Sequence, residues 1–301
     1  MIIHNEFTLD LRRFNRSNLT YTSTSEGVRQ EFHDVIAAAR NNIRISGVGE
    51  RFRVLIRNEV DISLHFQRMG KFDTLDLFTP EDLMMFEDYT VLAKGGCNQF
   101  VDIGANIGLH SLVAKKLGFK VVAYEPDPVN FEYLTKNFEL NFTGISSESL
   151  MLINSAVGDK SGSREFVRLS DNPFGNHILG AKAEVYGEYL KITVNCLDAS
   201  TDLELSSRSI VKIDAEGSDY EILRALFVNI SRNPMSRCLV FLGDWREECR
   251  EKIFRMLTDK FLDATNRSSG ITVKSIEHLP QPRTSGYVVV ALGIELSNLN
   301  E

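Results

Sequence analysis

Residues 100–108 read FVDIGANIG and residues 121–127 read VVAYEPD, and these two stretches decide the fold. In each, an apolar run of strand length leads to an acidic residue, and two glycines follow the acid in the first. The pattern predicts a buried strand that turns sharply into a helix, followed by a second buried strand. In such a unit a ligand approaches the helix N-terminus, and the acid after the second strand accepts ribose hydroxyls. The sequence therefore predicts a site for an adenosine-containing ligand.

The spacing of the glycines narrows the choice of ligand. A dinucleotide site needs G-x-G-x-x-G, because three glycines let a pyrophosphate lie against the backbone. Here Gly104 and Gly108 are separated by Ala105, Asn106 and Ile107, and no third glycine follows at that spacing. This loop suits a ligand without a pyrophosphate whose amino-acid end meets the helix N-terminus, as in S-adenosylmethionine.

Five segments, in this order, carry a resemblance to a known family. They are DIGANIG at 102–108, EPDP at 125–128, Leu134 with Asn137 and Asn141, AVG at 156–158, and KIDAEG at 212–217. Over about residues 70–245 the chain resembles the FkbM family of S-adenosylmethionine-dependent methyltransferases. The resemblance implies a seven-stranded methyltransferase fold and methylation of a hydroxyl on a sugar or a polyketide-like product.

Composition and charge are compatible with this interpretation. The chain has 301 residues, of which 43% are hydrophobic and 25% charged, enough for one large domain with an extension. The net charge of −7 and the lack of Lys/Arg runs argue against a nucleic-acid partner. No 18 apolar residues run together, and charges interrupt residues 1–13, so we expect neither a membrane span nor a signal peptide.

The cysteines predict a reducing compartment. Cys97, Cys196, Cys238 and Cys249 are far apart and lack metal-ligand spacing. We interpret them as free thiols in a soluble, cytoplasmic protein. The oligomeric state does not follow from the sequence.

The first part of the chain is expected to be an α+β extension, with residues 1–75 preceding a methyltransferase domain at 76–301. Residues 28–41 have helical character, and a strand at 52–57 is expected to pair with one at 62–66. One interpretation of the extension is a substrate lid or dimerisation arm. The other, which we favour, is a flanking hairpin that covers a sheet edge.

Beyond this extension, strands and helices alternate, which predicts a doubly wound, Rossmann-like α/β sheet that is mostly parallel. The expected strands are 98–103, 119–125, 149–154, 209–214 and 237–243. The expected helices begin at Pro80, after the cap Thr79, and include 108–117, 128–141, 218–228 and 247–262. The apolar run at 288–292 predicts a late strand, and the resemblance implies that it is the antiparallel C-terminal strand of the methyltransferase fold.

An insertion at 159–198 separates the third and fourth strands of this sheet. It contains expected strands at 163–169 and 191–194 around the loop DNPFGNH at 171–177. Loops at the carboxyl ends of parallel strands are where such sheets bind ligands, so this one is our candidate for substrate contacts. A surface loop without a ligand fits the sequence equally well.

The predicted cofactor site combines three segments. Its residues are Asp102, Gly104, Ala105, Asn106, Gly108, Glu125, Pro126, Asp127, Ala156, Val157 and Asp214. Glu125 is expected on the ribose, whereas Asp102 either contacts the ligand ammonium or only orders its turn. Asp127 can equally cap the next helix. The resemblance places the adenine near Ala156 and Val157.

The chemistry is expected at Asp214 and Glu216, at the end of the fourth strand. Methyl transfer from a sulfonium to oxygen is an in-line displacement, so alignment provides most of the acceleration, and the acceptor proton needs a nearby base. We expect one of the two acids to be the base or substrate anchor; His177 is an alternative base, and a purely structural acid pair is the other interpretation. Asp244, with Asp214, would allow a divalent metal, which the resemblance does not require.

Two further side chains have alternative interpretations. His110 can reach the cofactor carboxylate or pack in the core, and Trp245 can stack on an acceptor or simply pack.

The sequence therefore favours an S-adenosylmethionine-dependent O-methyltransferase with a sugar or other small-molecule acceptor. Methylation of nitrogen is an alternative on the same fold. From other classes, an NAD-dependent oxidoreductase is disfavoured by the missing third glycine and by the segments EPDP and KIDAEG. A non-catalytic scaffold is disfavoured because Gly104, Glu125 and Asp214 are all present.

Overall fold

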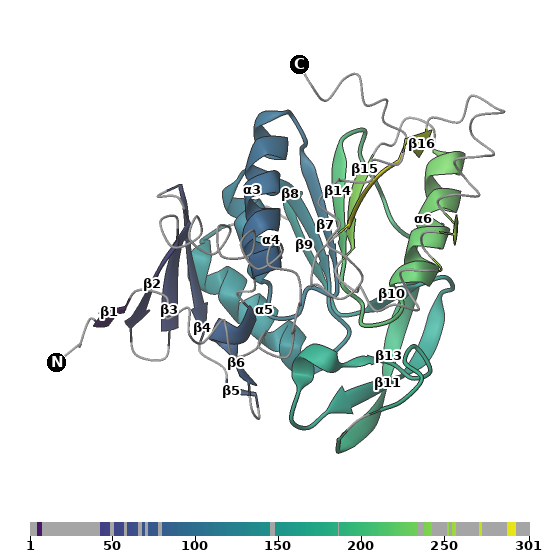
Figure 1. The fold of residues 1–301 in the computed structure, drawn as a ribbon, viewed down its shortest axis with the longest axis horizontal. Coiled ribbons are helices and arrows are strands. Elements are labelled where there is room, and N and C mark those ends of the chain that lie inside the picture. The colour runs from purple at the N-terminus through teal and green to yellow at the C-terminus, as the bar shows by residue number, and fades with distance from the viewer. Residues whose placement is uncertain are drawn as a thin grey trace, which may run out of the picture.

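The molecule consists of a central sheet with helices on both sides, flanked by two smaller sheets (Figure 1). The computed structural model describes residues 5–7, 43–48, 51–56, 59–65, 68–69, 72–77, 80–144, 148–185, 187–233, 238–242, 252, 255–256, 271–272 and 288–292. The expected helix at 28–41 lies outside these residues, as do Asp244 and Trp245. Of the expected helix at 247–262 only three residues are described, and all three are helical.

The central sheet has the strand order β16-β17-β15-β14-β7-β8-β9. Its strands are β7 (Gln99–Ile103), β8 (Lys120–Tyr124), β9 (Leu150–Ile153), β14 (Ser209–Ile213), β15 (Cys238–Leu242), β16 (Ile271–Thr272) and β17 (Val288–Leu292). Strands β9, β8, β7, β14 and β15 are mutually parallel, whereas β17 runs antiparallel to β15 and β16. The prediction of a mostly parallel α/β sheet is confirmed, and its five parallel strands match their expected bounds to within one residue.

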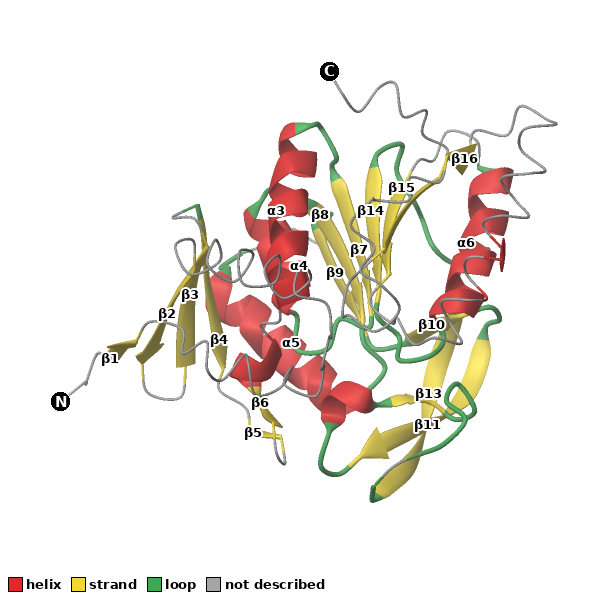
Figure 2. Cartoon of the chain, viewed as in Figure 1, coloured by secondary structure: helices red, strands yellow, loops and turns green. Residues whose placement is uncertain are grey.

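In the part of the chain that the structure describes, four long helices cover the two faces of this sheet (Figure 2). They are α3 (Pro80–Lys94), α4 (Leu109–Lys116), α5 (Pro128–Asn141) and α6 (Asp219–Arg232). Successive strand residues point to opposite faces: Phe100 packs in the cluster with α3, α4 and α5, and Val101 in the cluster with α6. Both faces are thus apolar, which explains the near-continuous hydrophobic runs of these strands.

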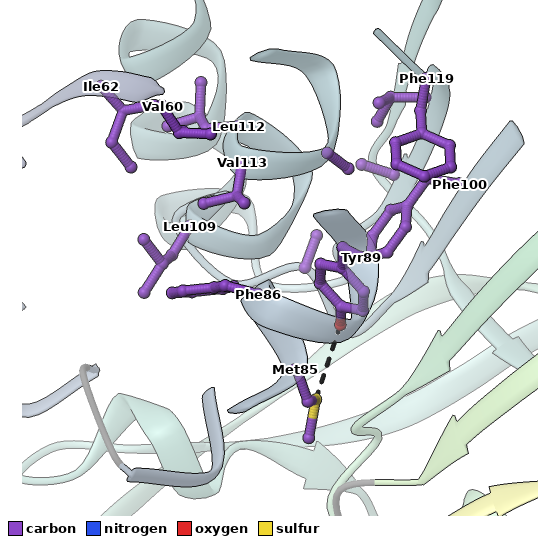
Figure 3. Close-up of a cluster of buried hydrophobic side chains, with 14 of the residues drawn as sticks. Val60, Ile62, Met85, Phe86, Tyr89, Phe100, Leu109, Leu112, Val113 and Phe119 are labelled. Atoms are coloured by element: carbon purple, nitrogen blue, oxygen red, sulfur yellow. Dashed lines mark hydrogen bonds between the residues drawn. The ribbon is translucent and has the colours of Figure 1, made fainter. Parts of the chain in front are cut away.

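The N-terminal part forms a separate four-stranded sheet beside α4 and α5. Its strands are β1 (Asn5–Phe7), β2 (Ile43–Val48), β3 (Arg51–Ile56) and β4 (Val60–His65), in that order. The expected hairpin is confirmed as the antiparallel pair β3 and β4. Val60 and Ile62 pack with Leu112 of α4 in one buried cluster that extends through Tyr89 to Phe100 (Figure 3). The described strands of this sheet pair with one another and not with an edge of the central sheet.

The insertion forms a second small sheet in the order β10-β13-β11-β12. These strands are β10 (Ala156–Gly158), β11 (Gly162–Leu169), β12 (His177–Ile178) and β13 (Tyr189–Asp198), with the short helix η2 (Pro173–Gly175) before β12. The two expected insertion strands are confirmed, and β13 is longer than predicted. The remaining short elements are β5 (Arg68–Met69), β6 (Phe72–Asp73) and η1 (Thr74–Leu77). Within the described part of the chain, no helix combines the length and apolarity that crossing a bilayer requires.

Candidate functional site

The loop between β7 and α4 lies where the carboxyl ends of β7, β8 and β14 meet. The N–H groups of Gly104 and Ala105 both donate to Tyr124 O of β8, at 3.0 and 2.9 Å. Gly104 has φ +78°, and a Cβ there would lie only 2.1 Å from Asp214 O of β14. Because that neighbour is backbone, this position requires glycine. The first predicted cofactor segment is therefore packed directly against the predicted catalytic segment.

Glu125 stands at the centre of this arrangement. Its Oε2 accepts from Asn106 N at 2.8 Å and its Oε1 from Asp127 N at 2.9 Å, and the residue is only 5% exposed. Burial raises the pKa of Glu125 to about 8, although the two backbone N–H donors oppose the shift. Each carboxylate oxygen keeps one lone pair beyond these bonds, so two hydroxyl donors can be accommodated.

Asp127 is the N-cap residue of α5, which was the alternative that the sequence left open. Its Oδ1 accepts from Val129 N at 2.7 Å and Asn130 N at 3.2 Å. Its Oδ2 accepts from Asn176 Nδ2 at 2.9 Å and forms an ion pair with Arg168 Nε at 3.2 Å. Four donors occupy the four lone-pair positions of a buried carboxylate, so the predicted cofactor contact is not supported by this geometry.

A buried lysine that the sequence analysis overlooked joins two of the predicted acids. Lys212 is the cross-strand neighbour of Asp102, and its Nζ lies 3.4 Å from Asp102 Oδ1 and 3.5 Å from Asp214 Oδ2. Ser111 of α4 donates to the other Asp102 oxygen at 2.7 Å. Burial lowers the pKa of Lys212, but the carboxylates of Asp102, Asp214 and Asp82 outweigh it, so the pKa lies above its usual value.

Removal of this lysine is expected to destabilise the protein strongly. In Lys212→Met, the fully buried carboxylate of Asp102 loses its counter-charge, which costs roughly 3–5 kcal/mol in the free energy of unfolding. Chemical denaturation measures this loss. The double variant with Asp102→Asn should recover part of it, because both charges are then gone. Lys136→Met, which removes an exposed ion pair with Glu132, is the control and should unfold as the wild type does. Equal denaturation midpoints for Lys212→Met and Lys136→Met would contradict the prediction.

Glu216 connects the end of β14 to the insertion. Lys182 Nζ forms a hydrogen-bonded ion pair with Glu216 Oε2 and also donates to Gly175 O at 3.4 Å. Glu216 has φ +49°, and Asn106 in the first loop has φ +52°; these are the only non-glycine residues with positive φ in the described part of the chain. Such strained backbone persists only where the surroundings impose it, and it concentrates at functional sites.

The insertion lies across two strand ends of the central sheet. Arg168 and Asn176 bind Asp127 after β8, and Lys182 binds Glu216 after β14. The structure thus places the predicted substrate loop beside the predicted catalytic acids. His177, the alternative base, is buried, and its Nδ1–H donates to Gly175 O at 2.8 Å, which orders the turn of its own loop. A base role for His177 stays a prediction.

His110 occupies the core position rather than an exposed helix face. It is 7% exposed, and its Nε2 lies 2.8 Å from Asp82 Oδ1 of α3. Its Nδ1 lies 3.1 Å from the hydroxyl of Tyr89, whose oxygen is also 3.5 Å from Met85 Sδ (Figure 3). These contacts use both ring nitrogens to join α4 to α3.

The predicted adenine segment lies in β10 and is buried. Ala156 and Val157 pair with Cys196 and Leu197 of β13, and both are less than 5% exposed. Ser155 Oγ donates to Asn195 O at 3.0 Å, so the segment is attached to the insertion. Pro126 is half-buried in the connection that follows Glu125, and its contact with a cofactor stays a prediction.

The metal hypothesis is tested only in part. Among the described residues, no group of three or more His, Cys, Asp or Glu side chains is placed to hold a metal ion. Asp244, on which the hypothesis depended, lies outside them.

The parallel sheet, the glycine loop and the acids at the carboxyl ends of β7, β8 and β14 define an α/β methyltransferase-like fold. Residues 102–243 match the family model described as "Methyltransferase FkbM domain". The match includes the glycine loop, Glu125, the insertion and the segment with Asp214 and Glu216. The family assignment inferred from the five sequence segments is confirmed.

Two curated relatives and one solved structure are similar to the chain. "Methyltransferase sdnD" of Sordaria araneosa is 26% identical over 196 residues, which are 55% of this chain and 73% of the relative. "Hexuronic acid methyltransferase AglP" of Haloferax volcanii is 25% identical over 125 residues, 42% of this chain and 48% of the relative. The crystal structure of methyltransferase FkbM from Methylobacillus flagellatus KT is 18% identical with a TM-score of 0.39, over 64% of this chain and 43% of that one.

Proposed function

We propose that the protein transfers a methyl group from S-adenosylmethionine to a hydroxyl of a sugar or other small-molecule acceptor. The observation that carries the proposal is the convergence of Asp102, Glu125 and Asp214 around one glycine loop. Methyltransferase activity follows from the family. The cofactor and the acceptor are the proposed part.

The residues of the loop fit S-adenosylmethionine, which when bound supplies a methyl group on a positively charged sulfur. Gly108, the N-cap residue of α4, has no side chain to satisfy the first N–H groups of the helix, so the cofactor carboxylate can approach them. Glu125 would accept the ribose hydroxyls through its remaining lone pairs. Asp102 would attract the ammonium group, although Lys212 already neutralises part of its charge.

The structure favours different roles for the two acids that the sequence treated as one unit. Asp214 has a 42% exposed side chain and can meet an acceptor, whereas Glu216 is paired with Lys182. We assign Asp214 as the base: as the acceptor oxygen bonds to the methyl carbon and the carbon–sulfur bond breaks, the hydroxyl proton moves to the Asp214 carboxylate. Glu216 would hold the insertion in place.

A sugar is the proposed acceptor class for two reasons. The curated relative from Haloferax volcanii is named for a hexuronic acid. The site also has lysines paired with the acids Asp214 and Glu216, and such charged groups suit a ligand with several hydroxyls better than an apolar one.

The cofactor is tested by calorimetric titration of the purified protein with S-adenosylmethionine, S-adenosylhomocysteine and NADH in parallel. We expect micromolar binding of the first two and none of NADH. Transfer of labelled methyl groups from S-adenosylmethionine to a panel of neutral sugars, uronic acids and amines then tests the acceptor. Binding of NADH alone would favour an oxidoreductase, and methylation of amines alone would overturn the O-methyl assignment.

A further inference from the structure

Helix α5 lies between the N-terminal sheet and two of the cofactor segments, the glycine loop and the segment of Glu125. At its first turn Asp127 caps the helix directly after Glu125, and Leu134 packs beside the glycine loop, where a Cβ on Gly108 would come within 2.4 Å of it. On its outer side the helix lies beside β4 (Figure 1). The N-terminal sheet therefore contacts the cofactor segments through α5 as well as through α4.

Two asparagines on α5 bind the free edge of β4. Asn141 Oδ1 accepts from Ser63 N at 2.7 Å, and its Nδ2 donates to Ser63 O at 2.6 Å. One turn earlier, Asn137 Oδ1 accepts from His65 N at 2.8 Å. Four helical residues rise about 6 Å, close to the roughly 6.8 Å between alternate strand residues, so the two amides match the spacing of the strand edge.

Only one of the two asparagines also reaches the glycine loop. Asn137 Nδ2 donates to Ile107 O at 2.8 Å, between Asn106 and Gly108, and Asn137 is completely buried. Asn141 instead donates to Asn137 O within its own helix. A single amide group therefore bridges His65 of β4 and Ile107 of the loop.

We infer that Asn137 is a positioning residue through which the N-terminal sheet holds the cofactor loop in its binding conformation. This gives residues 43–65 a part in cofactor binding, and the inference rests on the proposed cofactor. Asn106, immediately before Ile107, has φ +52°, and its own Oδ1 accepts from Ile107 N at 2.8 Å. Asn137 therefore binds the carbonyl of the residue whose N–H the Asn106 side chain already holds, so both backbone groups of Ile107 are bonded.

The matched pair Asn137→Ala and Asn141→Ala tests the inference in the full-length protein. Both variants remove bonds to β4, but only Asn137→Ala releases the loop. Calorimetry with S-adenosylhomocysteine, well below the melting temperature of each variant, should show roughly tenfold weaker binding for Asn137→Ala. Asn141→Ala should bind within about twofold of wild type, even if its melting temperature falls as far.

A second pair of variants changes β4 itself. It tests whether the bond between β4 and Asn137 supports cofactor binding, or whether only the bond between Asn137 and the loop matters. His65→Pro removes the N–H from which Asn137 accepts, and Ser63→Pro removes the N–H from which Asn141 accepts. Both N–H groups point to α5 and not into the ladder with β3, so the two substitutions disturb β4 in matched ways. With His65→Ala as the side-chain control, only His65→Pro should weaken binding. Equal affinities across either pair would overturn the inference. Failure of the wild type to bind S-adenosylhomocysteine would instead overturn the proposed cofactor.

Discussion

Asp214→Asn is expected to reduce the rate of methyl transfer by roughly 10²-fold or more while leaving cofactor affinity within about threefold of wild type. The asparagine has the same shape and can still accept a bond from Lys212 Nζ, which lies 3.5 Å from Asp214 Oδ2. It cannot take the acceptor proton at neutral pH. The loss should therefore appear in kcat, measured by label transfer, and not in the calorimetric Kd for S-adenosylhomocysteine.

Glu216→Gln is the matched control for this prediction. Glu216 stands two residues away on the same connection, but Lys182 already occupies one of its oxygens. Its loss should loosen the insertion and raise the KM for the acceptor more than it lowers kcat. If Asp214→Asn kept full activity and Glu216→Gln lost it, the two roles would have to be exchanged.

The framework of the fold was predictable because the sequence carries its pattern locally. Apolar runs before Gly104 and Glu125 gave strand bounds to within one residue, since both faces of a parallel strand are buried. Asn137 and Asn141, which the sequence shows only as part of the family resemblance, bond to neighbouring backbone. The partner strand could not be predicted, because His65 lies 72 residues earlier in the chain.

The sequence predicted which segments form the site, but not the contacts that their side chains make with one another. The sequence contains one signal that was overlooked: Lys212 interrupts the apolar strand SIVKI, and a charge in a buried strand needs a counter-charge nearby. No comparable signal marks the pair of Lys182 and Glu216. That contact depends on how a 40-residue insertion, 159–198 in our prediction, folds back over the sheet.

Glu125→Ala is expected to weaken binding of S-adenosylmethionine and S-adenosylhomocysteine by roughly 10²-fold or more. The estimate follows from the loss of hydrogen bonds between ribose hydroxyls and a charged acceptor, which contribute about 1.5–3 kcal/mol each. Glu125 also holds Asn106 N and Asp127 N, so part of the loss would come from the loop. Unchanged affinity in calorimetry would mean that the ribose does not bind at Glu125.

Glu125→Gln separates the contribution of the ribose hydrogen bonds from that of the loop contacts, through the pH dependence of stability and of binding. The pKa of Glu125 is raised to about 8 in the folded protein, from 4.5 ordinarily, so the folded state holds a proton that the unfolded state loses. Its contribution to stability is therefore greatest at low pH and declines as pH rises from about 4.5 to about 8. The glutamine variant lacks this decline, so its unfolding free energy should improve relative to wild type over that window.

Cofactor binding should show the opposite pH dependence at the same residue. Ribose hydroxyls donate more strongly to the ionised carboxylate than to the neutral acid, so binding expels the proton. In wild type the affinity for S-adenosylhomocysteine should rise with pH by up to about tenfold per unit below pH 8, with proton release measurable by calorimetry in buffers of different ionisation enthalpy. In Glu125→Gln the affinity for S-adenosylhomocysteine should be nearly independent of pH. A wild-type affinity that is equally flat would mean that the carboxylate does not meet the cofactor, since no ligand can bind an ionised group preferentially without displacing the proton it holds.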